Sequence, residues 1–155
     1  HLATILTSSD GTSWTTRTNP LQAIQLQPLT ISGITYGSST FVTVADAGRI
    51  MISTDGTTWT YIFKGGTHLY DITYGNSTFV TVGSSGTLLT SSDGTRNSWT
   101  SWTSLPLLAR GVTYGNSTFV VAGSSGIILT SDNGTSWTSR TSGTSNNLFG
   151  VTYSE

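Results

Sequence analysis

Short apolar runs, each followed by a cluster of turn-forming residues, recur along the whole chain. In residues 111–141 the runs GVTYG, FVVAG, IILTS and WTSRT are separated by NST, SSG and DNG. Runs of about five residues bounded in this way predict β-strands joined as consecutive hairpins. Glycine tolerates positive φ, and Asn and Asp side chains bond their own backbone, so these residues suit tight turns. No helical periodicity is present, and the pattern predicts an all-β protein.

The same sequence pattern recurs several times along the chain. TYGNSTFV occupies residues 73–80 and again 113–120, and TYGSSTFV occupies 35–42. The tyrosines of the repeat, Tyr36, Tyr74, Tyr114 and Tyr153, are 38, 40 and 39 residues apart. A fixed period of this length, with four short strands in each unit, is typical of β-propeller blades.

The strands of one unit differ in polarity, and the difference predicts how they are arranged. FVVAG and IILTS are mainly apolar runs. WTSRT instead alternates bulky or long side chains with small hydroxyl-bearing ones. A sheet that is apolar on both faces needs a similar sheet on each side. We therefore predict a β-propeller of four-stranded antiparallel blades at residues 33–63, 71–104 and 111–141. A β-solenoid or a β-sandwich is the alternative, but the Asp-Gly and Asn-Ser turns favour antiparallel hairpins.

The two ends of the chain match only parts of a blade. Residues 3–18 match the third and fourth strands, and residues 148–154 match the first strand. We expect segments 1–18 and 148–155 to form one split, incomplete blade without its apolar second strand. Unpaired strand edges recruit other chains, so we favour assembly into a homo-oligomer. A small closed ring with a defective blade and a fragment of a longer propeller are the alternatives.

A second motif ends in tryptophan. It reads SSDGTSW at 8–14, STDGTTW at 53–59, SSDGTRNSW at 91–99 and SDNGTSW at 131–137. These turns resemble the Asp-box, or BNR repeat, of the Asp-box β-propeller family, whose pattern is Ser/Thr-x-Asp-x-Gly-x-Thr/Ser-Trp. TSDNGTSW at 130–137 fits with Asp132 and Trp137, whereas the other three turns place the aspartate one residue closer to the glycine.

The resemblance covers almost the whole chain and implies a structural role for the turns. In that family the motif lies between the third and fourth strands, at the blade periphery, and serves folding. A carboxylate that bonds the backbone of its own turn, with a tryptophan packed on the blade, fits this role. The family includes sialidases, other glycosidases, lectins, sorting receptors and photosystem assembly factors. The residues assigned to the motif are Asp10, Trp14, Asp55, Trp59, Asp93, Trp99, Asp132 and Trp137.

Composition argues against several classes of function. Only 8% of residues are charged and the formal net charge is −1, so no electrostatic footprint indicates nucleic acid or an anionic membrane. The chain contains no cysteine, and no apolar run is long enough to span a bilayer. It begins with His1 and without a leader pattern, so we expect a mature form or a fragment. Abundant serine and threonine favour an extracellular location.

The sequence offers little for catalysis. Glycoside hydrolysis needs two carboxyl groups on one bond, but the only glutamate is Glu155. Asp46 and Asp71, the aspartates outside the Asp-box turns, fall in different blades, where we expect solvated turn residues. His68 lies near Asp71, yet no nucleophile is marked and no second interior histidine could complete a metal site. We expect no enzyme activity, no metal and no cofactor.

Recognition is therefore the leading hypothesis. Positions that break the repeat are the best binding candidates, because packing explains the repeated ones. Aromatic faces beside Asp, Asn and Arg suit sugars, although the aromatic residues can equally cover blade surfaces. We expect a non-enzymatic, lectin-like module that binds glycans through sites repeated between blades. A self-assembling structural subunit is the second hypothesis and a glycosidase-related remnant the third. The candidate ligand residues are Asp46, Arg49, Tyr61, His68, Tyr70, Trp102 and Arg110.

Overall fold

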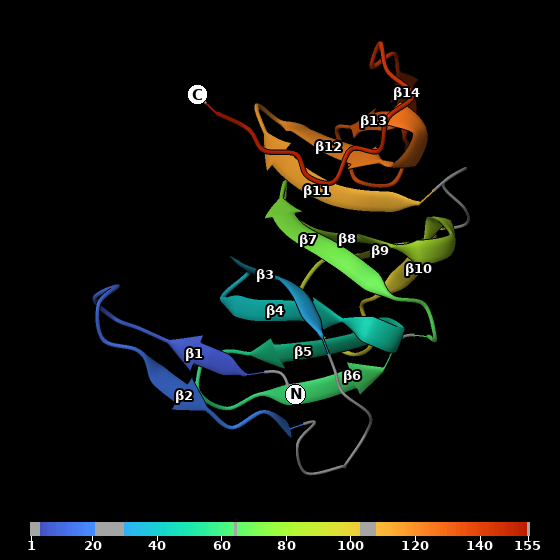
Figure 1. Ribbon diagram of the computed structural model, residues 1–155. Helices are drawn as coiled ribbons and strands as arrows, with labels where there is room; N and C mark the ends of the chain where they lie inside the picture. The colour runs from blue at the N-terminus through green and yellow to red at the C-terminus, as the bar shows by residue number, and fades with distance from the viewer. Residues whose placement is uncertain (1–3, 21–29, 64, 103–107, 155) are drawn as a thin grey trace.

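The described part of the chain forms three four-stranded antiparallel sheets and one two-stranded sheet (Figure 1). A computed structural model describes residues 4–20, 30–63, 65–102 and 108–154. Small parts of the predicted blades lie outside the described residues, namely 1–3, 103–104 and 155. The two-stranded sheet contains β1 (Ile5–Thr7) and β2 (Thr15–Arg17).

Each four-stranded sheet runs through its strands in chain order. The first contains β3 (Ile31–Gly37), β4 (Thr40–Ala45), β5 (Arg49–Ser53) and β6 (Thr60–Phe63). The second contains β7 (Leu69–Gly75), β8 (Thr78–Gly83), β9 (Leu88–Ser91) and β10 (Thr100–Trp102). The third contains β11 (Ala109–Gly115), β12 (Thr118–Gly123), β13 (Ile128–Ser131) and β14 (Thr138–Arg140). The first strands β3, β7 and β11 are neighbours from sheet to sheet (Figure 1). This is the radial stacking of propeller blades, as predicted.

The hairpin between the first and second strands explains the repeated eight letters. In the second blade Gly75 pairs with Thr78, so the loop has only two residues. Asn76 and Ser77 both have positive φ, 43° and 54°, which is the type I′ conformation that suits the twist of a hairpin. The rings of Tyr74 and Phe79, paired across the strands, lie 4.6 Å apart.

The glycine of this hairpin sets the spacing between blades. A Cβ atom at Gly75 would lie 2.1 Å from Cγ of Tyr114, on the first strand of the next blade. Gly37 has the same relation to Tyr74, and Gly115 to Tyr153. Each tyrosine therefore covers a bare glycine backbone of the preceding blade, and any side chain at that position would hold the blades apart.

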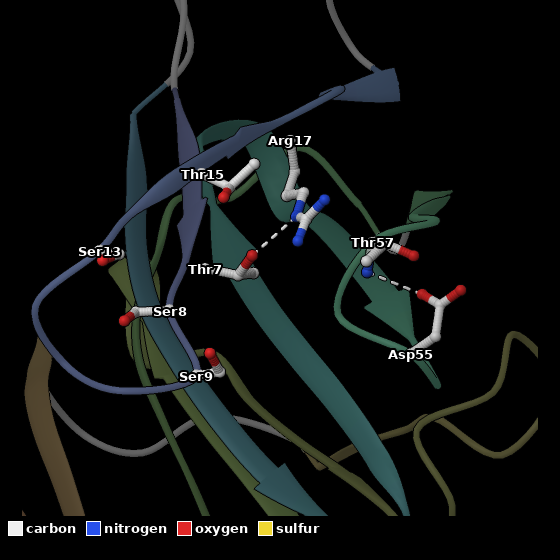
Figure 2. A pocket seen from close by; sticks show the side chains of 8 residues that line it. All are labelled: Thr7, Ser8, Ser9, Ser13, Thr15, Arg17, Asp55 and Thr57. Carbon is white, nitrogen blue, oxygen red and sulfur yellow. Dashed lines mark hydrogen bonds between the residues drawn. The ribbon is translucent and has the colours of Figure 1, made fainter.

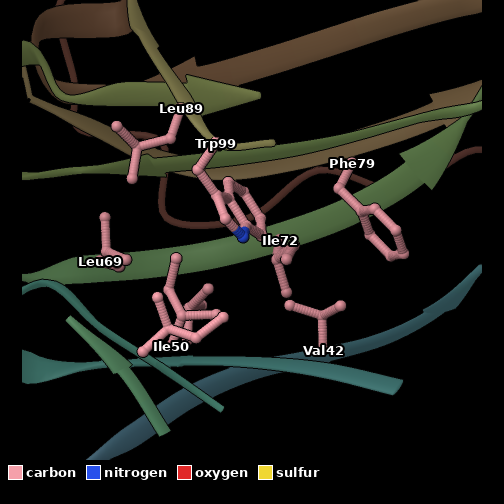
Figure 3. Close-up of a cluster of buried hydrophobic side chains, with 9 residues drawn as sticks. Val42, Ile50, Leu69, Ile72, Phe79, Leu89 and Trp99 are labelled. Carbon is pink, nitrogen blue, oxygen red and sulfur yellow. The ribbon is translucent and has the colours of Figure 1, made fainter. Parts of the chain in front are cut away.

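Apolar side chains fill the space between neighbouring blades (Figure 3). The first cluster joins residues of β4, β5 and β6 to residues of the second blade, including Ile72, Phe79 and Trp99. A second cluster joins Val80, Val82 and Leu88 of the second blade to the third blade. The middle blade is thus buried on both faces, which accounts for the buried side chains all along its second and third strands.

The four turns from Ser8 to Trp14, Ser53 to Trp59, Ser91 to Trp99 and Ser131 to Trp137 are called the Ser-to-Trp turns below. In the second of them, Asp55 Oδ1 accepts hydrogen bonds from the backbone N–H groups of Thr57 and Thr58, both at 2.7 Å. Trp59 Nε1 donates to the carbonyl of Gly56 at 3.2 Å. The carboxylate and the tryptophan therefore both stabilise their own turn.

The last Ser-to-Trp turn corrects one prediction. Asn133 Oδ1, not the carboxylate of Asp132, accepts the bonds from the N–H groups of Thr135 and Ser136, both at 2.9 Å. The serine that begins each turn fixes the alignment, since the Ser131 hydroxyl accepts from Gly134 N as Ser53 does from Gly56 N. The motif here is Ser-x-Asp/Asn-Gly, and Asp132 occupies its variable position.

The end segments do not combine into one blade within the chain. The β1–β2 sheet packs on the first blade, where Ile5 contacts Met51 and Trp59. Residues 148–154 run along β11 at the other end of the arc, and a Cβ at Gly111 would lie 3.1 Å from Gly150 Cα (Figure 1). This segment follows the path of a first strand but is not a strand, because no described second strand pairs with it. The chain therefore forms three complete blades and an incomplete one.

We predict that substituting Gly75 with alanine destabilises the protein, because the new methyl group would overlap the ring of Tyr114. The expected loss is about 1–3 kcal/mol in the free energy of unfolding, measured by urea denaturation. Gly66→Ala is the matched control, since nothing lies within 4 Å of its added Cβ. Equal stabilities for the two variants would contradict the proposed role of the glycine.

We also predict that replacing Asp10, Asp55 and Asp93 with asparagine flattens the acid dependence of stability. Backbone N–H donors hold the pKa values of Asp10 and Asp55 well below the ordinary value, and a hydrogen bond from Ser98 lowers that of Asp93. Their stabilisation is present above about pH 4 and is lost as the pH falls toward the depressed pKa values. Urea denaturation at several pH values measures the slope. Asn133→Asp is the reciprocal control and should steepen it, whereas an unchanged slope in both variants would contradict the assignment.

Candidate functional site

The two ends of the blades carry different features. The blade ends where the first strands begin also hold three short 3-10 turns, η2 (Asp46–Gly48), η3 (Ser84–Gly86) and η4 (Ser124–Gly126). We call this the helical-turn end. Antiparallel pairing puts the two-residue hairpins and the Ser-to-Trp turns at the opposite end, called the Trp-turn end.

Asp46 and His68, both predicted ligand residues, are brought together at the helical-turn end. His68 Nδ1 lies 2.9 Å from Asp46 Oδ1, and Asp46 Oδ2 accepts from the backbone N–H of Thr30 at 3.1 Å. Burial raises the pKa of Asp46, but the bonds from His68 and Thr30 outweigh it and leave the pKa below its ordinary value. The pair links the first blade to the second, and it uses both oxygens of the carboxylate.

Tyr70 and Arg110 are also brought together, across the next blade boundary. The guanidinium carbon of Arg110 lies 5.4 Å from the centroid of the Tyr70 ring and 5.1 Å from that of Phe149. Arg110 is thus enclosed between an aromatic ring of the preceding blade and one of the C-terminal segment. Distances of this size are typical of cation–π contacts.

The other three predicted ligand residues are separate from these pairs. Trp102 Nε1 donates to the hydroxyl of Thr90 at 2.6 Å on the rim of the second blade. Tyr61 packs beside the cluster around Met51, and its backbone carbonyl accepts from Arg96 at 3.3 Å. Arg49 begins β5 at the helical-turn end, and its buried Nε has no hydrogen-bond partner among the described residues.

Asp71 is not the solvated turn residue that we expected. It lies within β7, and its two oxygens accept from the backbone N–H groups of Ile72 at 2.8 Å and Val112 at 2.9 Å. Burial raises its pKa, partly offset by these bonds. Where Asp71 stands, the first and third blades have Gly33 and Gly111, so its carboxylate is an added bridge between β7 and β11.

A shallow polar pocket lies at the Trp-turn end beside the two-stranded sheet (Figure 2). Arg17 Nε donates to the hydroxyl of Thr7 at 2.7 Å, which fixes the guanidinium in the pocket. Asp55 and Thr57 of the next blade form the far wall. The remaining lining residues are hydroxyl-bearing: Ser8, Ser9, Ser13 and Thr15.

The same pocket occurs again on the third blade. Arg140 Nε donates to the hydroxyl of Thr130 at 2.8 Å, and Asp132 supplies a carboxylate. Thr118, Ser131, Ser136 and Thr138 complete it. The first two blades have Ile62 and Trp102 at the position of the arginine. The two arginine pockets therefore share the same pair of strands, the same turn and the same arginine–threonine bond.

Arg17, Arg140 and Phe149 were missed as candidates. A sequence signal for the arginines does exist, since both belong to a Trp-Thr-x-Arg stretch after a Ser-to-Trp turn. Phe149 stands three residues before the repeated Thr-Tyr pair, as Tyr70 and Arg110 do. That alignment shows that the three side chains come from equivalent positions.

Within residues 4–20, 30–63, 65–102 and 108–154, no three His, Cys, Asp or Glu side chains gather in a group that could hold a metal ion. The described part of the chain also has no helix long and apolar enough to cross a membrane.

No protein-family profile and no curated protein matches this chain. Solved structures do resemble it. The computationally designed Ika4 protein aligns with a TM-score of 0.68 and 13% identity, over 84% of each chain. YCF48 bound to D1 peptide aligns with a TM-score of 0.69 and 19% identity, over 96% of this chain and 50% of that one. The GH74 enzyme of Niastella koreensis aligns with a TM-score of 0.53 and 22% identity, over 83% of this chain and 20% of that one.

The chain thus spans about half the length of YCF48 and about a fifth of the GH74 enzyme. At these identities the likeness concerns the fold alone. The structure and its structural neighbours agree that this chain has the β-propeller fold.

Proposed function

We propose that this chain is a non-enzymatic recognition module that binds neutral glycans through the two arginine pockets. The observation that carries the proposal is the repetition of one polar pocket, around Arg17 and around Arg140. Packing requires the repeated tyrosines and glycines, but it does not require an arginine at this position, since Ile62 and Trp102 replace it in the other two blades.

The chemistry of each pocket suits a pair of sugar hydroxyl groups. Because Arg17 and Arg140 use Nε to bond a threonine, their terminal nitrogens can donate to a ligand. In the Arg140 pocket, Asp132 accepts no hydrogen bond through its carboxylate from any described residue, so this carboxylate can accept a hydrogen bond from a ligand hydroxyl. A sugar diol both donates and accepts, whereas an anionic ligand would be repelled by the carboxylate.

Two equivalent sites on one chain also favour binding to repeated ligands. Each pocket is shallow, and single-site affinity is expected to be low. Simultaneous engagement of both pockets on a glycan-bearing surface would raise the overall affinity about 10²–10⁴-fold when the geometry permits it. This mode of binding agrees with our expectation of an extracellular location.

The Ser-to-Trp turns support membership of the Asp-box propeller family, which includes lectins. Their aspartate or asparagine accepts hydrogen bonds from one or two backbone N–H groups of its own turn. In the complete blades the tryptophan Nε1 donates to a turn glycine carbonyl. We infer that these turns support the blades and that the arginine pockets beside them bind the ligand.

We predict that Arg17→Met and Arg140→Met each lower the apparent affinity for a glycan-coated surface about tenfold or more. The double variant should lose surface binding, measured by biolayer interferometry on neutral glycans selected from an array. Arg96→Met, outside both pockets, is the control for loss of charge. Trp102→Arg, beside Thr90, would place a third pocket and should strengthen binding. A double variant that binds as strongly as the unmodified protein would overturn the proposal.

Self-association is a second candidate function, favoured by one uncovered surface. Ile34 and Tyr36 on β3 are 58% and 57% exposed, whereas Ile72 and Val112, which occupy the position of Ile34 in the other blades, are only 4% exposed. The difference arises because each later blade has a complete blade in front of it, and the first has only β1 and β2. Another copy of the chain could cover this surface with its own blade face.

We predict an oligomer at micromolar concentration, detected by light scattering. Ile34→Glu should shift the protein toward the monomer mass, because the charge would be buried in the contact. Ser32→Glu, at an exposed polar position of the same strand, is the control. A monomer mass for the unmodified protein would exclude this candidate function.

A further inference from the structure

A second kind of binding site, separate from the arginine pockets, lies at the helical-turn end. We propose that Arg110, held between Tyr70 and Phe149, is the anchor of a site for a ligand carboxylate. The proposal does not depend on glycan binding at the arginine pockets, which lie at the opposite end of the blades.

The backbone places Arg110 in this position through an irregularity shared by all the blades. The pairing of β11 with β12 shifts register between Ala109 and Gly111, so Arg110 is the extra residue. The same shift occurs around Ser32 in β3 and around Tyr70 in β7. Bulges redirect a side chain out of the ladder, and these repeated bulges place one side chain from each blade in a row.

Two aromatic rings pack against the guanidinium, and no described residue forms a hydrogen bond with its terminal nitrogens. Tyr70 lies 5.4 Å from the guanidinium carbon and Phe149 lies 5.1 Å from it, and they belong to neighbouring segments on either side. Stacking of this kind fixes the plane of the group, so its terminal nitrogens are already oriented for a planar partner. Phe149 is 69% exposed, which leaves an apolar surface for the carbon skeleton next to a ligand's carboxylate.

No described residue neutralises this charge. Arg110 makes no hydrogen bond and no ion pair within the described chain, and its Nε is buried without a partner. Arginine is always protonated at physiological pH, and a buried N–H group without an acceptor is unfavourable. An anion bound at the guanidinium would supply the opposite charge that the described residues do not.

The acidic groups at this end are already bound elsewhere. Asp71 accepts from two backbone N–H groups, and Asp46 accepts from His68 and Thr30. The remaining described aspartates belong to the Ser-to-Trp turns at the opposite end. Glu155 is the only acidic residue outside the described part of the chain.

The geometry favours a carboxylate over a more highly charged anion. A guanidinium edge matches the two oxygens of a carboxylate with parallel hydrogen bonds. Asp71 and Asp46 at the same end would repel a dianion more strongly than a singly charged group. The ligand class is thus an organic monocarboxylate, carried by a peptide or by an acidic sugar.

The test follows the Nε–Hε signal of Arg110 by two-dimensional proton–nitrogen NMR during titration with sodium acetate at constant ionic strength. We expect a saturable shift with half-saturation in the millimolar range, and none with acetamide. Arg110→Lys removes this signal, so its titration is followed by the backbone N–H of Phe149, and acetate binding should weaken at least tenfold. Phe149→Leu should weaken binding severalfold by removing one ring. Arg96→Lys, an exposed arginine outside both kinds of site, is the control and should leave the titration unchanged.

Two further comparisons identify the source of the carboxylate. A short peptide with a free C-terminus is compared with its amidated form, and glucuronate is compared with glucose. Binding of either carboxylate form, but not of its neutral counterpart, supports the site. The proposal is overturned if acetate and acetamide cause equal shifts or if no shift saturates. It is also overturned if Glu155→Gln moves the Arg110 signal before acetate is added, because Glu155 would then be the partner.

Discussion

Contact between a bare glycine backbone and the tyrosine ring of the next blade controls the architecture of this protein. The contact occurs three times, from Gly37 to Tyr153, and it brings the first strands close enough for valine, isoleucine and leucine to fill the space behind them. Without it, sheets that are apolar on both faces would remain partly hydrated. The repeated sequence Thr-Tyr-Gly is therefore needed for packing between neighbouring blades as well as for the hairpin turn within each blade.

This packing divides the side chains into two groups. Residues that repeat in every blade are occupied by contacts within and between sheets, as the pairing of Tyr74 with Phe79 illustrates. Several of the residues that vary lie at the two ends of the blades. The row that contains Tyr70 and Arg110 is set by a bulge, and the arginine pockets are set by the Ser-to-Trp turns. Binding chemistry can thus change without disturbing the stack.

Most of the fold could be predicted from the sequence, because period, turn residues and strand polarity all indicate stacked four-stranded sheets. The sites were harder to predict. Asp132 matched the spacing of the Asp-box pattern, but the hydroxyl of Ser131 sets the turn and selects Asn133. Arg17 and Arg140 had the appearance of ordinary rim residues, since their pocket depends on a threonine ten residues earlier. Arg110 contacts one ring from the preceding blade and one from the C-terminal segment. The sequence of a single repeat contains neither ring and so could not predict these contacts.

The use of Asn133 in one turn bears on the chemical ageing of the protein. Asparagine followed by glycine is prone to lose ammonia, because the glycine nitrogen can attack the side-chain carbon. Here the N–H of Gly134 is bonded to the Ser131 hydroxyl at 2.8 Å, which directs it away from that attack. If hydrolysis to aspartate nevertheless occurs, the product carries the same acceptor oxygen as Asp55 does in its own turn. An aspartate product would keep the shape of the turn and add one negative charge next in sequence to Asp132 of the Arg140 pocket, whereas opening to isoaspartate would lengthen the backbone.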